Sequence, residues 1–388
     1  MDQRIRFVLE RRSGDVSMAA LCRAFGISRQ TGYKWLRRFA EVGELAKLTE
    51  RSRRPKSHPR QTPMKMQRTV VQARRQHPHW GPRKLRAWLM SRGVDAPAAS
   101  TIGEILRHAG LVAPRRRRRR ATPSTQPFGE CSAPNQVWCI DFKGEFRTGD
   151  GQWCIPLTVT DAFSRFILCC VAVAAPDTIT VRRILTRLFR ELGLPDAFRS
   201  DNGPPFASTG AAGLSRLSAW WLKLGIRHER IEPGKPQQNG RHERMHLTLS
   251  RETANPPAPT IVAQQRRFDR FCRTFNHERP HEALDHATPA SIYTPSLKRM
   301  PPLVAAFTYP FCETRLVSED GTVQWGRGRL FITAALANEV VGIQRISEHN
   351  CEILFGPITI GILDERQRNR GLIRYRVDHR KVSAMYPV

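Results

Sequence analysis

Residues 137–142 read VWCIDF, and they open the stretch of sequence, ending at Glu243, that decides the fold of this chain. The first acid of that stretch, Asp141, closes an apolar run, and a second acid, Asp201, directly follows AFRS at residues 197–200. Glu243 comes soon after PQQNG at residues 236–240, and no Pro or Gly follows it until Pro256, which predicts a helix. Acids at the ends of two strands and on a following helix could converge around divalent metal, because Mg²⁺ prefers oxygen ligands.

Four ordered motifs in this region resemble those of bacterial insertion-sequence DDE transposases with a retroviral-type integrase catalytic core. They are WCIDF at 138–142, RSDNGP at 199–204, GKPQQNGRHERMH at 234–246 and FNHERPHEAL at 275–284, the last followed by TPA at 288–290. The resemblance covers residues 130–295 well, the N-terminal region in layout and the C-terminal tail weakly. One departure is the spacing of the second and third acids, which is longer than is usual in that family. We place the extra residues around 208–217.

The resemblance implies a catalytic and metal-binding role for Asp141, Asp201 and Glu243. Asp141 would bridge two Mg²⁺ ions, for which Mn²⁺ can substitute, while Asp201 and Glu243 would each hold one ion. Two such ions, about 3.5–4 Å apart, can stabilise both the attacking and the leaving oxygen of a phosphodiester. The expected enzyme is therefore a DDE-type transposase or integrase, which requires no covalent enzyme–DNA intermediate.

The pattern of apolar residues predicts an α/β core with the element order of a ribonuclease-H-like fold. The predicted strands lie at 137–142, 153–160, 166–174, 197–200 and 226–231, and the predicted helices at 181–192, 214–224 and 261–277. All-α helix-turn-helix units precede this core, and short strands at 323–325, 329–333, 339–346 and 351–363 suggest a small C-terminal β-barrel. We therefore divide the chain into a helix-turn-helix domain (1–55), a second helix-turn-helix-like domain (56–113), a basic linker (114–127), the catalytic core (128–297) and the barrel (303–388).

The charge of the chain points to a polyanionic partner. The net charge is +30, and residues 1–120 hold 30 Lys or Arg against 8 Asp or Glu, so most of the excess lies in the first third. Such a basic block is typical of a surface that binds nucleic acid, and double-stranded DNA is the expected partner. An acidic membrane surface is the competing partner, but no apolar run approaches ~18 residues and no signal-peptide pattern is present.

The nine cysteines are scattered, without a Cys-x-x-Cys pair. Their spacing argues for reduced thiols and against a structural zinc site. Reduced thiols suggest a cytoplasmic protein, and the resemblance to bacterial transposases implies that it is bacterial and nucleoid-associated.

Residues 17–39 predict a helix-turn-helix. Gly26 supplies the break between the helices, and Ser28 is a suitable N-cap for the second one. That second helix leaves five residues available for a DNA groove, namely Arg29, Gln30, Thr31, Tyr33 and Lys34. An ordinary helical hairpin is the alternative, and the surrounding basic block favours DNA binding.

A second helical unit spans residues 64–112, in which Ser100 is the predicted cap of the last helix and Gly110 its end. This unit is either a second groove reader or a packing module. Six consecutive arginines follow it: Arg115, Arg116, Arg117, Arg118, Arg119 and Arg120. Such a run contacts phosphates without reading sequence, the alternative being a solvated, disordered segment. Near the third acid, Lys235, Arg241 and Arg244 are candidate contacts to the DNA backbone.

Other polar residues of the core are expected to have structural roles. Asp161 follows the second strand and is predicted to serve a turn or an ion pair rather than a metal. His242 and His246 could bind metal or DNA, but we expect them to be exposed polar residues. Glu229 and Glu232 are alternatives to Glu243 as the third acid, and Glu243 is preferred because a helix directs a carboxylate better than a Pro/Gly loop does.

Together these features predict a transposase that binds the ends of a mobile DNA element and catalyses metal-dependent DNA cleavage and strand transfer. Joining two ends at once implies a homo-oligomer, at least a dimer on DNA. Two alternatives stay open: a metal-dependent nuclease with the same core, and a catalytically inactive DNA-binding regulator derived from a transposase. A tyrosine or serine recombinase is disfavoured, because no tyrosine lies in a recognisable Arg/His constellation.

Overall fold

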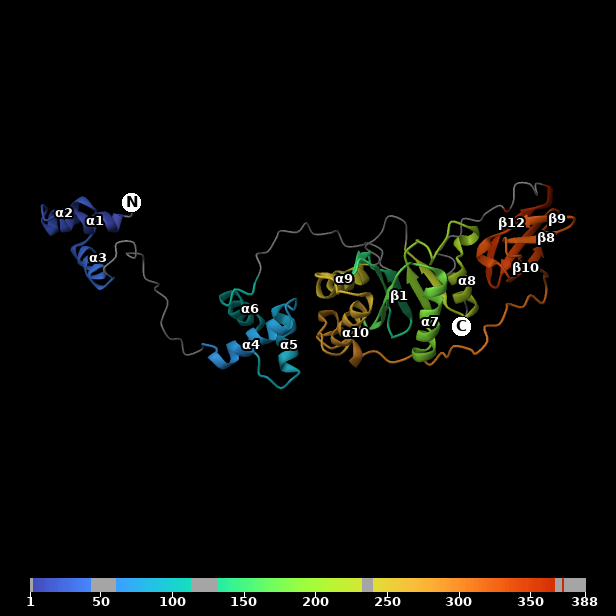
Figure 1. The fold of residues 1–388 in the computed structure, drawn as a ribbon, viewed down its shortest axis with the longest axis horizontal. Coiled ribbons are helices and arrows are strands. Elements are labelled where there is room, and N and C mark those ends of the chain that lie inside the picture. Colours follow the sequence, from blue (N-terminus) through green and yellow to red (C-terminus); the bar gives the residue numbers. More distant parts are fainter. Residues whose placement is uncertain (1–2, 43–60, 113–130, 232–239, 367–371, 373–388) are drawn as a thin grey trace. The chain divides into compact units, whose positions relative to one another are not determined.

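The structure, a computed structural model, describes residues 3–42, 61–112, 131–231, 240–366 and 372 of the 388-residue chain (Figure 1). The chain divides into two compact units, residues 1–63 and residues 64–388. In the described part of the chain, no helix combines the length and the apolar character that are needed to cross a membrane.

The first unit is a three-helix domain, which consists of α1 (Gln3–Arg12), α2 (Met18–Ala24) and α3 (Arg29–Val42). Phe7 of α1 is fully buried, and its ring packs edge-to-face on Phe25 and Trp35, each at a centroid distance of 5.4 Å. The predicted helix-turn-helix is confirmed as α2 and α3. The helix α1 was not predicted, although it supplies the central residue of this core.

Two serines set the starts of the helices in this domain. The Ser17 hydroxyl accepts a hydrogen bond from the Ala20 N–H at 3.3 Å, and the Ser28 hydroxyl accepts one from the Thr31 N–H at 3.2 Å. Each bond satisfies a backbone donor that has no partner within its helix. The predicted cap at Ser28 is therefore confirmed.

The second unit begins with three more helices: α4 (Met64–Gln76), α5 (Pro82–Met90) and α6 (Ala99–His108). Their shared core contains Trp80, Leu85, Trp88 and Ile102, so an apolar face of α5 is buried in it. The three helices therefore have a hydrophobic core of their own.

The ends of α6 were predicted only in part. Ser100 is not its cap, because the helix begins at Ala99 and Ala98 occupies the cap position without a side-chain hydrogen bond. Gly110 ends the helix as expected. It adopts a φ of 69°, a left-handed conformation that glycine takes without steric cost.

The central domain is built on a mixed sheet. Its strands are β1 (Val137–Phe142), β2 (Phe146–Arg147), β3 (Trp153–Asp161), β4 (Ile167–Val173), β5 (Ala197–Ser200) and β6 (Arg227–Arg230). The order is β2-β3-β1-β5-β6, and β4 also pairs with β3. Strand β1 runs antiparallel to β3 and parallel to β5, and β5 runs parallel to β6. This arrangement agrees with the predicted ribonuclease-H-like core.

Helices cover both faces of this sheet (Figure 1): α7 (Thr178–Leu192) and α8 (Arg216–Lys223) on one, α9 (Gly240–Leu249) and α10 (Ile261–His277) on the other. Trp138 and Ile140 of β1 pack in the cluster of α7 and α8. Cys154 and Cys170 pack in the cluster of α9 and α10. Because successive side chains of a strand point to opposite faces, Asp141 lies on the α9 face.

Short helical turns complete this unit. They are the 3₁₀ turns Ala211–Gly213, Glu282–Leu284, Pro289–Ser291 and Ala334–Leu336, and the π turn Ser250–Ala254. The first lies within residues 208–217, the segment that we assigned as extra. Ala211 and Leu214 of that segment are buried in the hydrophobic cluster of the C-terminal domain. Residues 208–217 therefore contribute to packing, whether or not they are the extra residues of the family comparison.

The C-terminal domain contains two antiparallel sheets. Its strands are β7 (Glu313–Leu316), β8 (Thr322–Trp325), β9 (Gly328–Phe331), β10 (Val340–Arg345), β11 (Asn350–Phe355) and β12 (Ile358–Asp364). One sheet has the order β12-β11-β10-β7, and β8 pairs with β9 in the other. The predicted closed barrel is not confirmed, because in the described residues the two sheets are open and share a core without a common ladder. The strand predicted at 351–363 is a hairpin, since Gly356 turns the chain with a φ of 55°.

Candidate active site

Two acids lie at one edge of the central sheet. Asp141 is the fifth residue of β1, and Asp201 follows the last residue of β5. Because β1 and β5 are parallel and paired in register, with Cys139 opposite Arg199, their carboxyl ends lie at the same edge. The Asp141 side chain is 20% exposed, whereas Asp201 is exposed. This edge therefore presents two carboxylates from adjacent strands.

Hydrogen bonds fix the turn that carries Asp201. Its Oδ1 accepts a bond from the Gly203 N–H at 3.1 Å, and the Ser200 hydroxyl donates to its carbonyl oxygen at 2.8 Å. The Asn202 side-chain amide donates to the carbonyl oxygen of Ile231 at 2.6 Å, which ties the turn to the end of β6. The direction of the Asp201 carboxylate is therefore set by its own loop.

The third acid, Glu243, lies in the first turn of α9 and is exposed. Met245 and Leu249 of the same helix are buried against the sheet in the cluster that includes Phe268. A carboxylate near a helix N-terminus is stabilised by the helix dipole. The packing of α9 thus holds Glu243 on the face of the sheet that carries Asp141.

The surroundings of Asp141 disfavour its charged form. Burial first, and then the carboxylates of Asp201 and Glu243, raise the pKa of Asp141 to about 7, although the Phe142 backbone and Lys143 act in the opposite direction. A carboxylate that raises the pKa of another carboxyl group lies near it. A divalent cation would offset both the burial and the mutual repulsion, and the oxygen ligands suit Mg²⁺. The donor set therefore fits a divalent cation.

A buried cluster of two threonines and two histidines lies next to Asp141. Thr158 is directly opposite Asp141 in the ladder of β1 and β3. Its Oγ1 lies 2.8 Å from Nε2 of His242, 2.7 Å from Nε2 of His246 and 3.1 Å from the carbonyl oxygen of Asp141. Oγ1 of Thr160 lies 2.9 Å from Nδ1 of His242. These hydrogen bonds tie α9 to the sheet.

His242 and His246 are not the exposed residues that we expected. Their exposed fractions are 3% and 6%, because positions i and i+4 of α9 share the face that packs on β3. Burial lowers the pKa of His242 to about 3, and burial, His242 and Lys143 lower the pKa of His246 to about 2, so both rings are neutral. The missed signal was this spacing together with Thr158 and Thr160, which share one face of a strand.

Two other acids of the core have structural partners. Asp161 is 1% exposed, and its Oδ1 accepts bonds from the Ser164 N–H at 2.7 Å and the Ser164 hydroxyl at 2.6 Å, which confirms its predicted turn role. Glu229 forms an ion pair with Arg199 at 2.8 Å. Glu232, the other rival of Glu243, lies outside the described residues.

The predicted DNA contacts lie partly within the described residues. Four of them are exposed on α3: Arg29, Gln30, Tyr33 and Lys34. Thr31 is half-buried, and its hydroxyl lies 3.0 Å from that of Ser28, so it also serves the start of α3. Arg244 is exposed on α9. Outside the described residues lie Arg115, Arg116, Arg117, Arg118, Arg119, Arg120, Lys235 and the side chain of Arg241.

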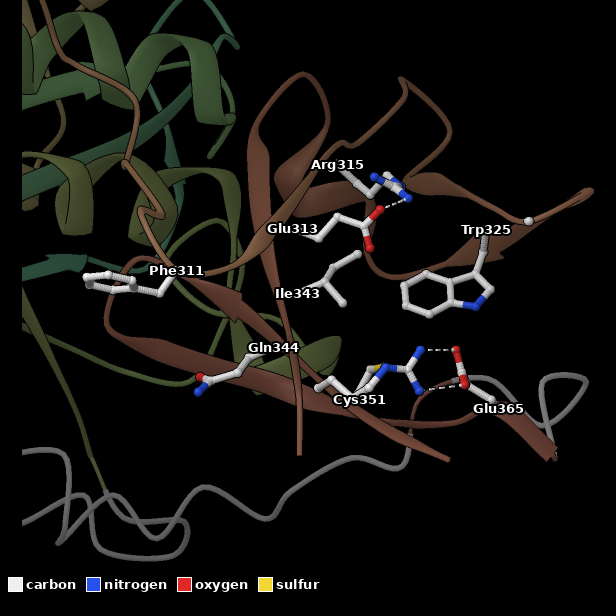
Figure 2. Close-up of a pocket in the computed structure, with 10 residues that line it drawn as sticks. Phe311, Glu313, Arg315, Trp325, Ile343, Gln344, Cys351 and Glu365 are labelled. Atoms are coloured by element: carbon white, nitrogen blue, oxygen red, sulfur yellow. Dashed lines mark hydrogen bonds and ion pairs between the residues drawn. The ribbon is translucent and has the colours of Figure 1, made fainter. Parts of the chain in front are cut away.

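A separate concavity of about 610 Å³ lies in the C-terminal domain, and none of the predicted site residues lines it. Figure 2 shows Trp325 and Ile343 in its walls, together with paired charged side chains. Arg345 pairs with Glu365 at 3.1 Å, and Arg315 pairs with Glu313. Because these charges compensate one another, the concavity lacks the concentrated charge of the three acids.

Comparison with known proteins adds independent information. Two family models described as "Integrase core domain" match residues 132–236 and 224–289. A homeodomain-like model matches residues 31–106, and a helix-turn-helix model matches residues 3–56. The matched segments thus include the described helices of the N-terminal region and all three candidate acids.

Relatives occur in bacterial insertion elements and in retroviruses. A 31.7 kDa protein of insertion element IS407 from Burkholderia multivorans is 30% identical over 223 residues, which cover 57% of this chain and 78% of that protein. A 39.2 kDa protein of IS476 from Xanthomonas euvesicatoria is 32% identical over 183 residues, 46% of this chain and 50% of that protein. The Gag-Pol polyprotein of baboon endogenous virus is 28% identical over 209 residues, 53% of this chain and 12% of the polyprotein.

Among solved structures, the HTLV-2 integrase catalytic core domain in complex with magnesium matches 42% of this chain and 99% of that chain, with 16% identity and a TM-score of 0.34. The family models agree with the order of domains described above. The chain therefore belongs to the transposase and integrase family, and it carries an integrase core domain that is preceded by helix-turn-helix domains.

Proposed function

We propose that this protein is a DDE-type transposase, which binds the ends of a mobile DNA element and catalyses metal-dependent DNA cleavage and strand transfer. The observation that carries the proposal is the cluster of Asp141, Asp201 and Glu243, in which burial and the neighbouring carboxylates raise the pKa of Asp141. Such a cluster costs stability in the absence of a cation, and strongly perturbed groups of this kind gather at functional sites. The family of the chain supports the same assignment.

In this proposal Asp141, Asp201 and Glu243 would together hold two Mg²⁺ ions, for which Mn²⁺ can substitute. When bound, the ions supply activation of the attacking water or 3′-hydroxyl and stabilisation of the leaving oxygen. The protein itself holds the three carboxylates in position. Strand β1 fixes Asp141, the hydrogen-bonded turn after β5 fixes Asp201, and the cluster around Thr158 fixes the helix that carries Glu243.

Recognition of DNA is assigned to the basic part of the chain. Arg29, Gln30, Tyr33 and Lys34, exposed on α3, would enter a groove of the element end, with Thr31 at the helix start. The arginines at 115–120 would bind phosphates without sequence preference, and Lys235, Arg241 and Arg244 would hold the DNA backbone near the third acid. Because two ends are joined together, the active species is a homo-oligomer on DNA.

A combined cleavage and joining assay tests the proposal. Full-length protein is incubated with Mg²⁺, a supercoiled target plasmid and duplex oligonucleotides that carry the inverted repeats flanking its gene. We expect cleaved element ends and joined products, both of which require those end sequences and Mg²⁺. Cleavage without joined products would identify a nuclease, and binding without cleavage would identify an inactive regulator. Either result would overturn the proposal.

A further inference from the structure

The hydrogen bonds around Thr158 determine where the protons of its histidine neighbours lie. A hydroxyl carries one proton, and the carbonyl oxygen of Asp141, 3.1 Å away, can only accept it. The Nε2 atoms of His242 and His246, 2.8 and 2.7 Å from the same hydroxyl oxygen, must therefore both donate to it. With Nε2 as the donor in both rings, Nδ1 is the ring nitrogen that remains, and a metal ion can bind there because metal binding displaces any proton from its ligand. Nδ1 of His242 accepts the proton of the Thr160 hydroxyl at 2.9 Å.

Nδ1 of His246 lies near Asp141 and not near a threonine. The distance from this nitrogen to Oδ2 of Asp141 is 3.9 Å, which is longer than a hydrogen bond. Ligand atoms of Asp141, His242 and His246 lie within 4.8 Å of one another. An unprotonated imidazole nitrogen beside a carboxylate is a ligand pair for first-row transition metals, whereas Mg²⁺ takes oxygen ligands. Metal–nitrogen and metal–oxygen bonds of about 2.0–2.2 Å can together span the observed separation.

We propose that Nδ1 of His246 and Oδ2 of Asp141 bind one divalent transition metal together, so that the cation position at Asp141 is a mixed nitrogen–oxygen site that prefers Mn²⁺ to Mg²⁺. The inference rests on the proposed function, in which Asp141 is a metal ligand, and it adds a ligand that the three acids do not supply. His242 is not a ligand in this arrangement, because its Nδ1 is engaged by Thr160.

The surroundings of His246 are those of a histidine prepared to bind metal. A ligating histidine donates its other ring N–H to an oxygen, which fixes the tautomer and the orientation of the ring. Here Nε2 donates to Thr158, and Thr158 in turn is bonded to the backbone of Asp141. The side chain of His246 is 7% exposed, so the packing around it holds the ring with Nδ1 near Asp141.

Glutamine at position 246 separates the two roles of this histidine. In His246→Gln the side-chain amide can still donate to Thr158, but the nitrogen lone pair that faces Asp141 is lost. His242→Gln is the matched control, because it makes the same change one turn away on the same buried face, where Nδ1 faces Thr160. Mn²⁺ and Mg²⁺ are titrated separately into metal-free, full-length protein by calorimetry, after thermal unfolding has shown that each variant is folded.

We expect His246→Gln to weaken Mn²⁺ binding about tenfold or more, the scale of losses seen when the shell of a metal site is altered, and to change Mg²⁺ binding little. His242→Gln should keep the wild-type ratio of the two affinities. Equal losses of Mn²⁺ and Mg²⁺ in His246→Gln, or the same selective loss in His242→Gln, would overturn the inference.

Asp141→Asn distinguishes failure of this inference from failure of the proposed function. If Asp141→Asn binds both ions like the wild type, the proposed metal site itself is wrong. If it loses both ions while His246→Gln keeps its affinity for Mn²⁺, only the role of His246 is wrong.

A measurement on the wild-type protein covers the case in which a variant does not fold. Pulsed EPR of substoichiometric Mn²⁺ bound to the wild type should show a directly coordinated imidazole nitrogen. A spectrum with oxygen ligands alone would overturn the inference without any substitution.

Discussion

At the scale of single residues, the charged side chain of Asp141 lowers the stability of the folded protein, although the proposed chemistry requires it as a metal ligand. Burial is the largest cause that raises its pKa from 3.8 to about 7. Between these two values the unfolded chain has released the proton and the folded protein retains it. The contribution of Asp141 to folding stability therefore falls as pH rises through this window, and above it the full penalty of a buried carboxylate remains.

Asp141→Asn should consequently stabilise the central domain in metal-free buffer at pH 8. The gain is a few kcal/mol at most, since each pKa unit corresponds to about 1.4 kcal/mol. It should shrink as the pH is lowered towards 4, and Mg²⁺ should stabilise the wild type more than the variant. Denaturant unfolding in EDTA and in Mg²⁺ measures both effects. Equal free energies of unfolding at pH 8 in EDTA would contradict the cause assigned to the raised pKa.

Glu229 differs from Asp141 because it forms an ion pair with an arginine, Arg199. The side chains of Arg199 and Glu229 are 10% and 23% exposed, so Glu229→Gln removes the anionic partner of a buried guanidinium. We expect a loss of about 1–3 kcal/mol in the free energy of unfolding, while joining activity per folded molecule is retained. Thermal unfolding and the joining assay, normalised to folded protein, measure the two effects. A folded but inactive variant would instead assign the third acid to Glu229.

At the scale of elements, continuous apolar runs bounded by turn residues were enough to predict most of the central domain. β1, β5 and α10 have the bounds that the sequence predicts. The buried face of α9 was missed because it contains His242 and His246, whose hydrogen-bond partners on β3 are distant in sequence. The hairpin of β11 and β12 was missed for a related reason, since its Gly356 lies inside an apolar run. The acids of the site were identified from the resemblance of their motifs to a known family. That Asp141 and Asp201 lie at the same edge of the sheet follows from the parallel pairing of β1 and β5.

The docking of α9 can be tested through the two threonines of β3. Thr158→Val removes an oxygen that serves His242, His246 and the carbonyl of Asp141, whereas Thr160→Val removes the partner of one histidine nitrogen. Each buried polar group left without a partner costs about 1–3 kcal/mol. The free energy of unfolding should therefore fall clearly more in Thr158→Val than in Thr160→Val, and the amides of α9 should exchange faster with solvent. Equal effects of the two substitutions would contradict the hydrogen-bond pattern.

At the scale of the whole molecule, the positive charge and the candidate chemistry belong to different parts of the chain. Most of the net charge of +30 lies in residues 1–120, whereas the three acids belong to the central domain. Affinity that depends on phosphate contacts weakens with salt, because bound Lys and Arg release counterions from DNA. We therefore assign general DNA affinity and end recognition to the N-terminal part and the reaction to the core.

Replacing Arg115 to Arg120 with Gln should reduce the salt dependence of DNA binding without changing the preferred sequence. The slope of log affinity against log salt should fall by about 0.9 for each phosphate contact that is lost. Binding to element-end and unrelated duplexes is measured over a range of salt concentrations. A variant that prefers a different sequence would show that these arginines read bases or DNA shape.

The central claim is tested most directly by strand transfer with Glu243→Gln and the wild type at equal occupancy of element-end DNA in Mg²⁺. The substitution replaces a carboxylate with an amide of the same shape, and α9 keeps its anchors at His242 and His246. We expect the variant to bind element ends like the wild type and to produce neither cleaved ends nor joined products. Joined products formed by Glu243→Gln at the wild-type rate would contradict the assignment of the active site.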